Sequence, residues 1–330
     1  MPPLTDEIAF RVLPEIDAPP RFPEGVQREA VLMLAERLPS QVTRKALLWV
    51  TTLQAHIENE LWLNWANNIP GFQGVTYGFV PVAEGSRANG GIKQFGSYVF
   101  GVAIEIEPGE SPDQAIELLR YENIPFACVF NRRLAELHVA NPNFPVGTGA
   151  CWARSQKRKI QPASDGVLTA AHVVQQARLR GPVSMDAPGL WHLGDRGTCK
   201  IDAALVVQTG CIPSGTSRLP IQYHPIGTTD VFFDGVGTAG TVHARITHTI
   251  THPTYLSGRN PMRVFFDKYG VSGDSGALIR EKNTGLGVAL YMGRELVPPF
   301  IGAPATMATF EGVAQHLGQA EYVLQAELSI

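Results

Sequence analysis

The sequence contains few cysteines, and their arrangement argues against a disulfide framework. Only four occur in 330 residues, and no two have Cys-x-x-Cys spacing: Cys128, Cys151, Cys199 and Cys211. Cys199 and Cys211 are near enough in sequence to pair, but reduced, buried thiols are the favoured interpretation for an intracellular protein.

Charge and long apolar runs are also scarce. Charged residues make up 17% of the chain and the formal net charge is −3, so there is no basic surface of the kind that nucleic-acid binders carry. No stretch approaches the ~20 apolar residues of a membrane helix, and the first residues lack a secretory pattern. We therefore expect a cytoplasmic protein with neither membrane nor nucleic acid as partner. Its 44% hydrophobic content is enough for a sizeable core.

The first part of the chain predicts a lead-in followed by two helices. Residues 1–24 are rich in proline and acidic residues and are predicted to be extended. Apolar residues at helical spacing predict helices over 25–38 and 41–66, with Ser40 as the N-cap of the second. That helix carries Trp49, Trp62 and Trp65, which indicate either a core helix or a face for an oligomer or partner.

The pattern then changes to strands and one more helix. Strands are predicted over 75–82, 95–107 and 124–130, with a glycine-rich turn at 85–91 and a helix over 111–121. Residues 25–140 therefore form a helical and α/β module, and 141–145 form a linker. From 141 to 330 short strands dominate, with helical periodicity returning only at 312–324.

Three segments of this second part carry residues suited to catalysis. Residues 166–174 run from a strand into Thr-Ala-Ala-His, which ends at His172. Asp202 stands at the head of an apolar strand over 201–207. Residues 270–279 contain Gly-Asp-Ser-Gly, in which Ser275 lies 73 residues after Asp202.

These motifs, in the order His, Asp, Ser, resemble those of the trypsin-like (chymotrypsin-fold) serine proteases; other triad folds use other orders. The resemblance covers about 145–311. It implies a mainly β domain of two six-stranded antiparallel β-barrels, spanning 141–330 and preceded by a smaller α/β domain. Less sharply, the strands before it resemble the module that precedes some bacterial trypsin-like proteins and the plant narrow-leaf protein.

The resemblance also implies the role of each residue. His172 is the general base for Ser275, and Asp202 orients the imidazole. The amides of Gly273 and Ser275 form the oxyanion hole. The substrate is a protein or peptide, and neither a cofactor nor a metal is required.

Substrate contacts are expected on two segments. Residues 286–293 resemble the strand that pairs with substrate backbone after the nucleophile, which assigns Leu290, Tyr291 and Met292 to substrate binding. Tyr269 stands where digestive members carry the residue that sets specificity. It is not acidic, so cleavage after Arg or Lys is not implied. Asp267 is a candidate for reaching this pocket from the side.

Other departures from the family pattern bear on location and activation. Val173 and Val271 replace cysteines of secreted members, which indicates an intracellular, bacterial-type branch. In zymogen-activated members the equivalent of Asp274 pairs with a new N-terminus. Cleavage at Arg132-Arg133 is one way to create such a terminus, although an ordinary exposed basic pair is the favoured interpretation.

Two sets of residues offer alternatives to these assignments. Asp186 and Asp195 are rival third members of the triad, but neither opens an apolar strand. A metal site at His243, His248 and His252 is disfavoured, because in a strand residue 243 points away from the other two. These histidines are instead expected on the strand surface or at the substrate cleft.

The sequence therefore predicts a regulated intracellular serine endopeptidase, in which the N-terminal module serves regulation or assembly. Activation by a protein partner or by homo-oligomerisation is left open. The alternatives are a catalytically silent protease-fold scaffold that binds extended peptides and the protease component of a bacterial defence or stress complex.

Overall fold

The computed structural model describes residues 2–15, 28–36, 38, 40–81, 94–107, 109–111, 113–121, 127–131, 136–137, 146–155, 164–174, 178–181, 191–196, 199–208, 210–251, 263–297 and 310–330, some by backbone only. Several sequence predictions fall outside these residues: the turn at 85–91, the linker at 141–145, Arg132, Arg133, Asp186 and His252. The side chains of Trp62, Cys128, Asp195 and Cys199 are not described either.

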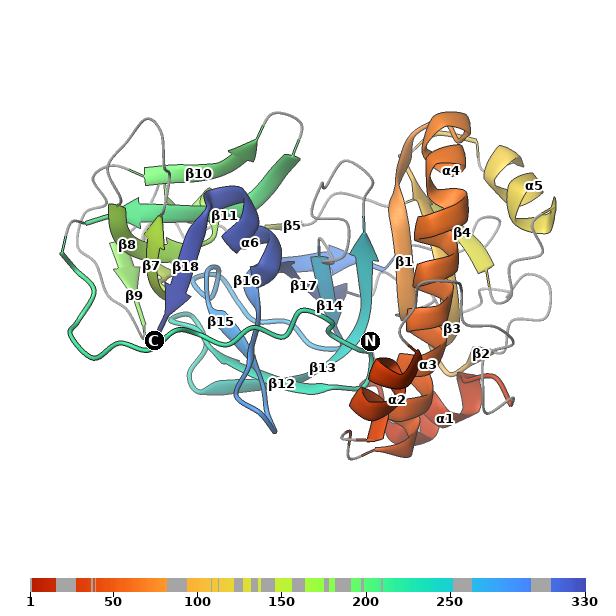
Figure 1. Cartoon of the computed structure of the whole chain (residues 1–330), viewed down its shortest axis with the longest axis horizontal. Coiled ribbons are helices and arrows are strands. Elements are labelled where there is room, and N and C mark those ends of the chain that lie inside the picture. The colour runs from red at the N-terminus through yellow and green to blue at the C-terminus, as the bar shows by residue number, and fades with distance from the viewer. Residues whose placement is uncertain are drawn as a thin grey trace.

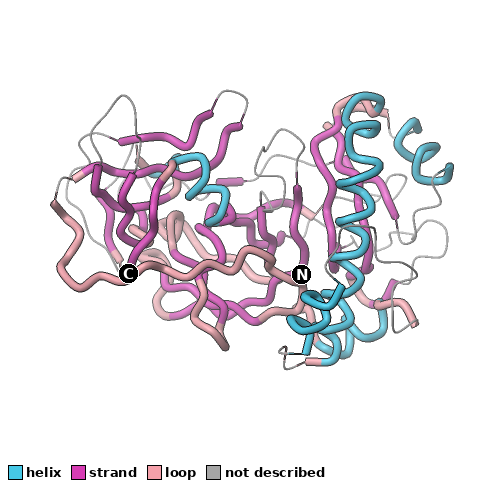
Figure 2. Tube along the Cα trace, viewed as in Figure 1, coloured by secondary structure: helices cyan, strands magenta, loops and turns pink. Residues whose placement is uncertain are grey.

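The helices of the N-terminal half gather at one end of the molecule around a few strands, whereas the rest is mostly strands with one further helix among them (Figures 1 and 2). The N-terminal module comprises α1 (Asp6–Val12), α2 (Arg28–Glu36), α3 (Gln41–His56), a π-helical turn η1 (Ile57–Leu61), α4 (Trp62–Asn68), β1 (Phe72–Pro81), β2 (Gln94–Phe95), β3 (Tyr98–Ile106), α5 (Asp113–Tyr121) and β4 (Ala127–Asn131). Strand β3 lies between antiparallel β1 and parallel β4. Every residue of β3 is buried, so its sequence is almost continuously apolar. None of the described helices combines the length and apolar character needed to cross a bilayer.

The structure corrects two predictions in this module. The lead-in is not wholly extended, because α1 begins at Asp6. Thr5 caps this helix by accepting a hydrogen bond from the Ile8 amide, and Asp6 and Glu7 lie in its first turn. Ser40 does occupy the N-cap position of α3, but its side chain makes no capping hydrogen bond. Trp49 and Trp65 are buried core residues.

The remaining elements are β5 (Glu136–Leu137), β6 (Val146–Thr148), β7 (Cys151–Ser155), β8 (Ser164–Thr169), a 3₁₀ turn η2 (Ala171–Val173), β9 (Arg178–Arg180), β10 (Trp191–Arg196), β11 (Cys199–Val207), β12 (Asp230–Asp234), β13 (Thr241–Thr251), β14 (Arg263–Phe266), β15 (Leu278–Glu281), β16 (Gly287–Leu296), β17 (Phe310–His316), α6 (Leu317–Leu324) and β18 (Ala326–Ser329). Strands β12-β15-β16-β17-β14-β13 form a ring that the β12–β13 pairing closes. This is one six-stranded antiparallel barrel.

The other β unit is an open sheet in the part of the chain that the structure describes. Its order is β10-β11-β8-β7-β18, and a separate parallel pair joins β6 to β9. Closure of a second six-stranded barrel stays a prediction.

The prediction of helix over 312–324 is wrong for its first part. Residues 310–316 form strand β17 of the closed barrel, and α6 begins only at Leu317. The short apolar run 312–314 suits either structure by pattern alone, and its pairing with β14 and β16 decides it.

The N-terminal module and the closed barrel share one sheet. Strand β13 pairs with β12 and β14 inside the barrel and also with β1 of the module, where Gly78 lies opposite His248. The eleven-stranded sheet therefore continues from the barrel into the module (Figure 1).

Candidate active site

The structure pairs two of the three predicted catalytic residues directly. His172 lies in the 3₁₀ turn after β8, and Asp202 lies on β11, which pairs with β8. His172 Nδ1 is 2.7 Å from Asp202 Oδ2, and the backbone amide of His172 donates to Asp202 Oδ1 at 3.0 Å. The carboxylate therefore holds both the ring and the backbone of the histidine.

Ser275 lies on a loop that packs against the histidine turn. The next residue, Gly276, has φ +91°. A Cβ at this position would be 3.2 Å from the Ala170 nitrogen and would collide with the Thr148 carbonyl oxygen and the Thr169 hydroxyl. Only glycine fits this approach. The loop of the nucleophile is thus pressed against the chain two residues before His172.

The structure does not form a hydrogen bond between Ser275 and His172. The Ser275 hydroxyl donates to the Met292 carbonyl at 2.9 Å. Among the described residues His172 Nε2 is buried and has no hydrogen-bond partner. The imidazole is therefore oriented through Nδ1, while its second nitrogen is not engaged by a protein group.

Gly273 has the geometry expected of an oxyanion-hole residue. Its φ of +102° favours glycine, and its carbonyl accepts a hydrogen bond from the Thr148 hydroxyl at 2.8 Å. Within the described residues its amide donates no hydrogen bond. With the carbonyl tied back, that amide is free to bind an oxyanion.

Asp274 is buried and satisfied by donors from the chain itself. Its carboxylate accepts the amides of Gly237, Thr238 and Val271, each at 2.8 Å, and also the Thr238 hydroxyl. The carboxylate therefore has its hydrogen-bond donors from the intact chain. Residues 132–133 lie outside the described residues, so processing there stays a prediction.

The predicted substrate residues occupy different environments. Leu290 and Tyr291 are fully buried, and the Tyr291 ring stacks on Phe233 at 4.8 Å. Strand β16 pairs with β15 and β17 here, so these two side chains belong to the barrel core. Their assignment to substrate binding stays a prediction. The Met292 side chain is also in the core, and only its carbonyl faces the nucleophile.

Tyr269 does lie at the surface near the nucleophile loop. It is 40% exposed and meets the Phe310 ring edge-on at 6.3 Å. The Arg294 guanidinium lies 4.2 Å from the Phe310 centroid and 5.6 Å from that of Tyr269. Asp267 was a candidate for reaching the specificity pocket from the side. Its carboxylate instead accepts hydrogen bonds from the backbone amides of Leu4 and Arg245.

Two supporting residues were missed by the sequence analysis. Thr148 joins the two units: its hydroxyl donates to Gly273, its amide donates to the Ser275 carbonyl, and its carbonyl accepts from Thr169. Gln315, on the barrel strand β17, accepts the Asp202 amide at 3.3 Å. Neither residue belongs to a motif, so only its position in the fold identifies it.

The structure describes the side chains of two of the histidines and two of the cysteines considered above. His243 is exposed, whereas His248 is buried against Phe265, 3.6 Å from Glu311, so its assignment to the strand surface is wrong. No cluster of metal-ligating side chains occurs among the described residues.

Cys151 and Cys211 are free thiols, so Cys211 does not pair with Cys199. Burial raises the pKa of the Cys151 thiol to about 12.

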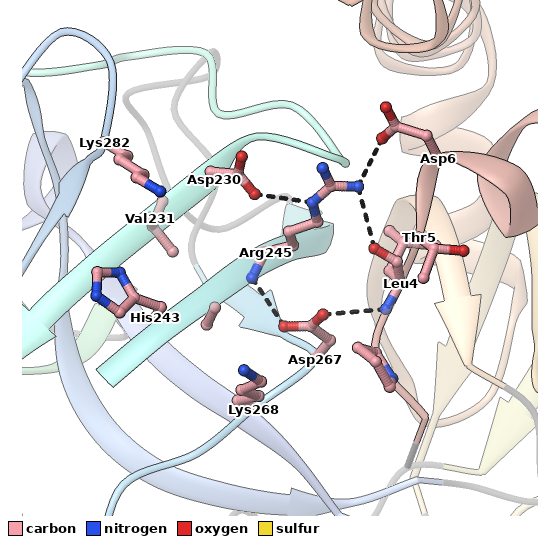
Figure 3. Close-up of a pocket in the computed structure, with 12 residues that line it drawn as sticks. Leu4, Thr5, Asp6, Asp230, Val231, His243, Arg245, Asp267, Lys268 and Lys282 are labelled. Carbon is pink, nitrogen blue, oxygen red and sulfur yellow. Dashed lines mark hydrogen bonds and ion pairs between the residues drawn. The ribbon is translucent and has the colours of Figure 1, made fainter. Parts of the chain in front are cut away.

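A cavity of about 320 Å³ lies away from the catalytic residues, between the N-terminal segment and the barrel (Figure 3). Charged side chains line it, including Asp230, Arg245, Asp267 and Lys282. His172 and Ser275 are not among its lining residues.

Comparisons with known proteins find only distant structural similarity. No family model matches the chain, and no curated protein matches it in sequence. Among solved structures, it is similar to a glutamic acid specific serine protease at 13% identity, covering 55% of this chain and 99% of that one with a TM-score of 0.35. It is also similar to the Nocardiopsis protease (14%; 56% and 93%; TM-score 0.33) and to Cellulomonas bogoriensis chymotrypsin (16%; 56% and 98%; TM-score 0.32). Matches this distant do not establish an activity.

Proposed function

We propose that the protein is a serine endopeptidase that cleaves peptide bonds through an acyl-enzyme on Ser275. The observation that carries this proposal is the part-buried His172–Asp202 pair, joined at 2.7 Å and 3.0 Å, with Nε2 bound by none of the described residues. A carboxylate at Nδ1 selects the tautomer in which Nε2 accepts a proton.

The chemistry follows from these positions. The Ser275 oxygen attacks the scissile carbonyl while its proton passes to His172 Nε2, and Asp202 stabilises the imidazolium. The amides of Gly273 and Ser275 bind the oxyanion. Collapse breaks the C–N bond, His172 returns the proton to the leaving amine, and water then releases the acyl group by the same steps.

Substrate binding has to break the hydrogen bond between the Ser275 hydroxyl and the Met292 carbonyl before Ser275 can attack. An extended substrate that donates a peptide N–H to the Met292 carbonyl has to take the place of β5, which pairs with Gly293 and Arg294 at this end of β16. The serine hydroxyl then loses its acceptor and turns to His172 Nε2, whose lone pair is available.

The same hydrogen bond favours a second candidate function. A serine that stays bound to the Met292 carbonyl is not a nucleophile, and the protein is then a silent scaffold that binds extended peptides. For either function, free Cys151 and Cys211 support a reducing, cytoplasmic location.

A fluorophosphonate probe separates the two candidates. We expect the full-length protein to be labelled at Ser275, and Ser275→Ala to abolish labelling and lower peptide cleavage by at least about 10⁴-fold. Ser272→Ala is the matched control, since Ser272 is an exposed serine of the same loop. Absence of labelling, with a peptide library added to engage β16, would establish the scaffold instead.

A further inference from the structure

The N-terminal segment is bound to the barrel by hydrogen bonds that meet at Asp267 and Arg245 (Figure 3). The Leu4 amide donates to Asp267 Oδ2 at 3.0 Å, and the Arg245 amide donates to Oδ1 at 2.7 Å. The Arg245 guanidinium donates to the Leu4 carbonyl at 3.2 Å, to Asp6 at 2.6 Å and to Asp230 at 2.8 Å. We call residues 2–6 the N-terminal strap.

The contact between Leu4 and Asp267 is shielded from water, whereas the Asp6 and Asp230 side chains are partly exposed. Leu4 is 1% exposed and Asp267 is 5% exposed. Burial raises the pKa of the Asp267 carboxyl, and the two backbone amides oppose that rise. A buried carboxylate depends on its donors far more than an exposed one does, so the strap and Asp267 stabilise each other.

Asp267 is the first residue of the segment that leads to the nucleophile. Strand β14 ends at Phe266, and the Asp267 amide donates to the Arg245 carbonyl at 3.1 Å. The next anchor is the Gly270 amide, which donates to the Tyr291 hydroxyl at 2.8 Å. The carboxylate of Asp274 then accepts the Val271 amide. Three anchors thus fix the backbone over the eight residues before Ser275, and the strap reinforces the first through the Leu4 amide, which donates to the Asp267 carboxylate.

The other end of the strap belongs to the N-terminal module. The Tyr98 hydroxyl of β3 donates to the Pro2 carbonyl at 3.0 Å. Thr5 is the N-cap of α1, so the strap continues directly into that helix. Movement of the module against the barrel therefore acts on Asp267 through residues 2–6.

We propose that the strap positions the nucleophile loop, with Asp267 as the positioning residue through which the N-terminal module controls the alignment of Gly273 and Ser275. This rests on the proposed peptidase function. Asp267 touches neither substrate nor triad. It acts by fixing where the loop begins, and release of the strap lowers the rate of acylation while leaving the His172–Asp202 pair intact.

The test compares Asp267→Asn with Asp230→Asn in the full-length protein. Asparagine keeps the shape of the side chain but replaces one carboxylate oxygen with an NH₂ group. That group cannot accept the hydrogen bond from the Leu4 or Arg245 amide that faces it. Asp230→Asn removes a partner of the same Arg245 without touching the loop. We expect Asp267→Asn to lower kcat and the rate of fluorophosphonate labelling by about tenfold or more, with KM within about twofold, since a hydrogen bond to a charged group is lost. Asp230→Asn should change neither value by more than about twofold.

Hydrogen exchange gives a readout that does not depend on activity. In Asp267→Asn the amides of residues 268–275 should exchange faster, while those of the His172 turn are unchanged. If Asp267→Asn does not fold, Asp6→Asn loosens the far end of the strap and should give the same change at smaller amplitude. Equal exchange and equal labelling in folded variant and wild type would overturn the inference. An unlabelled wild type that still shows the exchange difference would refute the peptidase function and leave the strap in place.

Discussion

At the residue scale, the site depends on groups that hold the catalytic residues from behind. The motifs predicted His172, Asp202 and Ser275 as one site, and the structure pairs the first two. The sequence could not indicate Thr148, because a threonine in a short strand has no distinctive pattern. Its three backbone and side-chain contacts arise only when two separate units meet.

Thr148→Val tests that supporting role. The substitution removes the hydroxyl that donates to the Gly273 carbonyl and accepts the Val236 amide. The buried Gly273 carbonyl loses a partner at about 1–3 kcal/mol, and the part-buried Val236 amide loses its acceptor as well. We expect kcat to fall by about 10- to 100-fold because the proposed oxyanion hole loses its alignment. Thr76→Val is the control, since Thr76 is an equally buried hydroxyl bonded to Glu105 in the N-terminal module. An equal loss of kcat in both variants would contradict a role at the site.

At the element scale, the boundary between β17 and α6 is set by a buried histidine. His316 is the N-cap of α6: its Nδ1 accepts the Gly318 amide at 3.1 Å, and its Nε2 lies 2.9 Å from the Gln222 carbonyl. Only the neutral ring can accept at one nitrogen and donate at the other. The helical pattern over 312–324 gave no sign of this boundary, because histidine is not a usual cap residue and the strand before it is decided by its pairing partners.

The burial of His316 predicts a pH dependence of stability. Desolvation lowers the pKa of this histidine from 6.5 to about 4. The unfolded chain therefore takes up a proton below about pH 6.5 that the folded chain binds only near pH 4. The free energy of unfolding should fall by ~3 kcal/mol between those values. His316→Asn keeps a capping side chain and should remove this part of the slope in urea denaturation. Parallel pH curves for variant and wild type would exclude the assignment.

At the scale of the whole molecule, the N-terminal module and the closed barrel are joined through backbone. Strand β13 is shared by the barrel and β1, so the two parts form one continuous sheet. The alternating and apolar patterns predicted most of these strands, but no local pattern states which strand pairs with which. The sequence analysis therefore treated the module as separate and placed a linker after it.

Gly78→Ala tests whether this junction carries stability for both parts. Gly78 has φ +126°, and a Cβ there would be 2.8 Å from the Thr247 carbonyl oxygen and 3.1 Å from the His248 Cα. We expect a loss of about 2–4 kcal/mol, seen as faster hydrogen exchange in β1 and in β13 together. Gly96→Ala is the control: its φ is +58° with nothing within 4 Å, so only about 1–2 kcal/mol of backbone strain is expected. Faster exchange confined to β1 would show that the two parts unfold separately.

The sequence by itself determined the local features: the strand-rich second half, the helices that precede it, and the spacing of a histidine, an aspartate and a serine in motifs with little freedom to vary. These features depend on hydrophobic periodicity and on short glycine-rich turns, both of which involve only a few neighbouring residues. Tertiary structure alone decided the closure of the barrel, the shared sheet, the strap on Asp267 and the hydrogen bond of Ser275 to Met292. Each of these depends on residues brought together from distant parts of the chain, and side-chain contacts at such separations leave no periodic trace in the sequence.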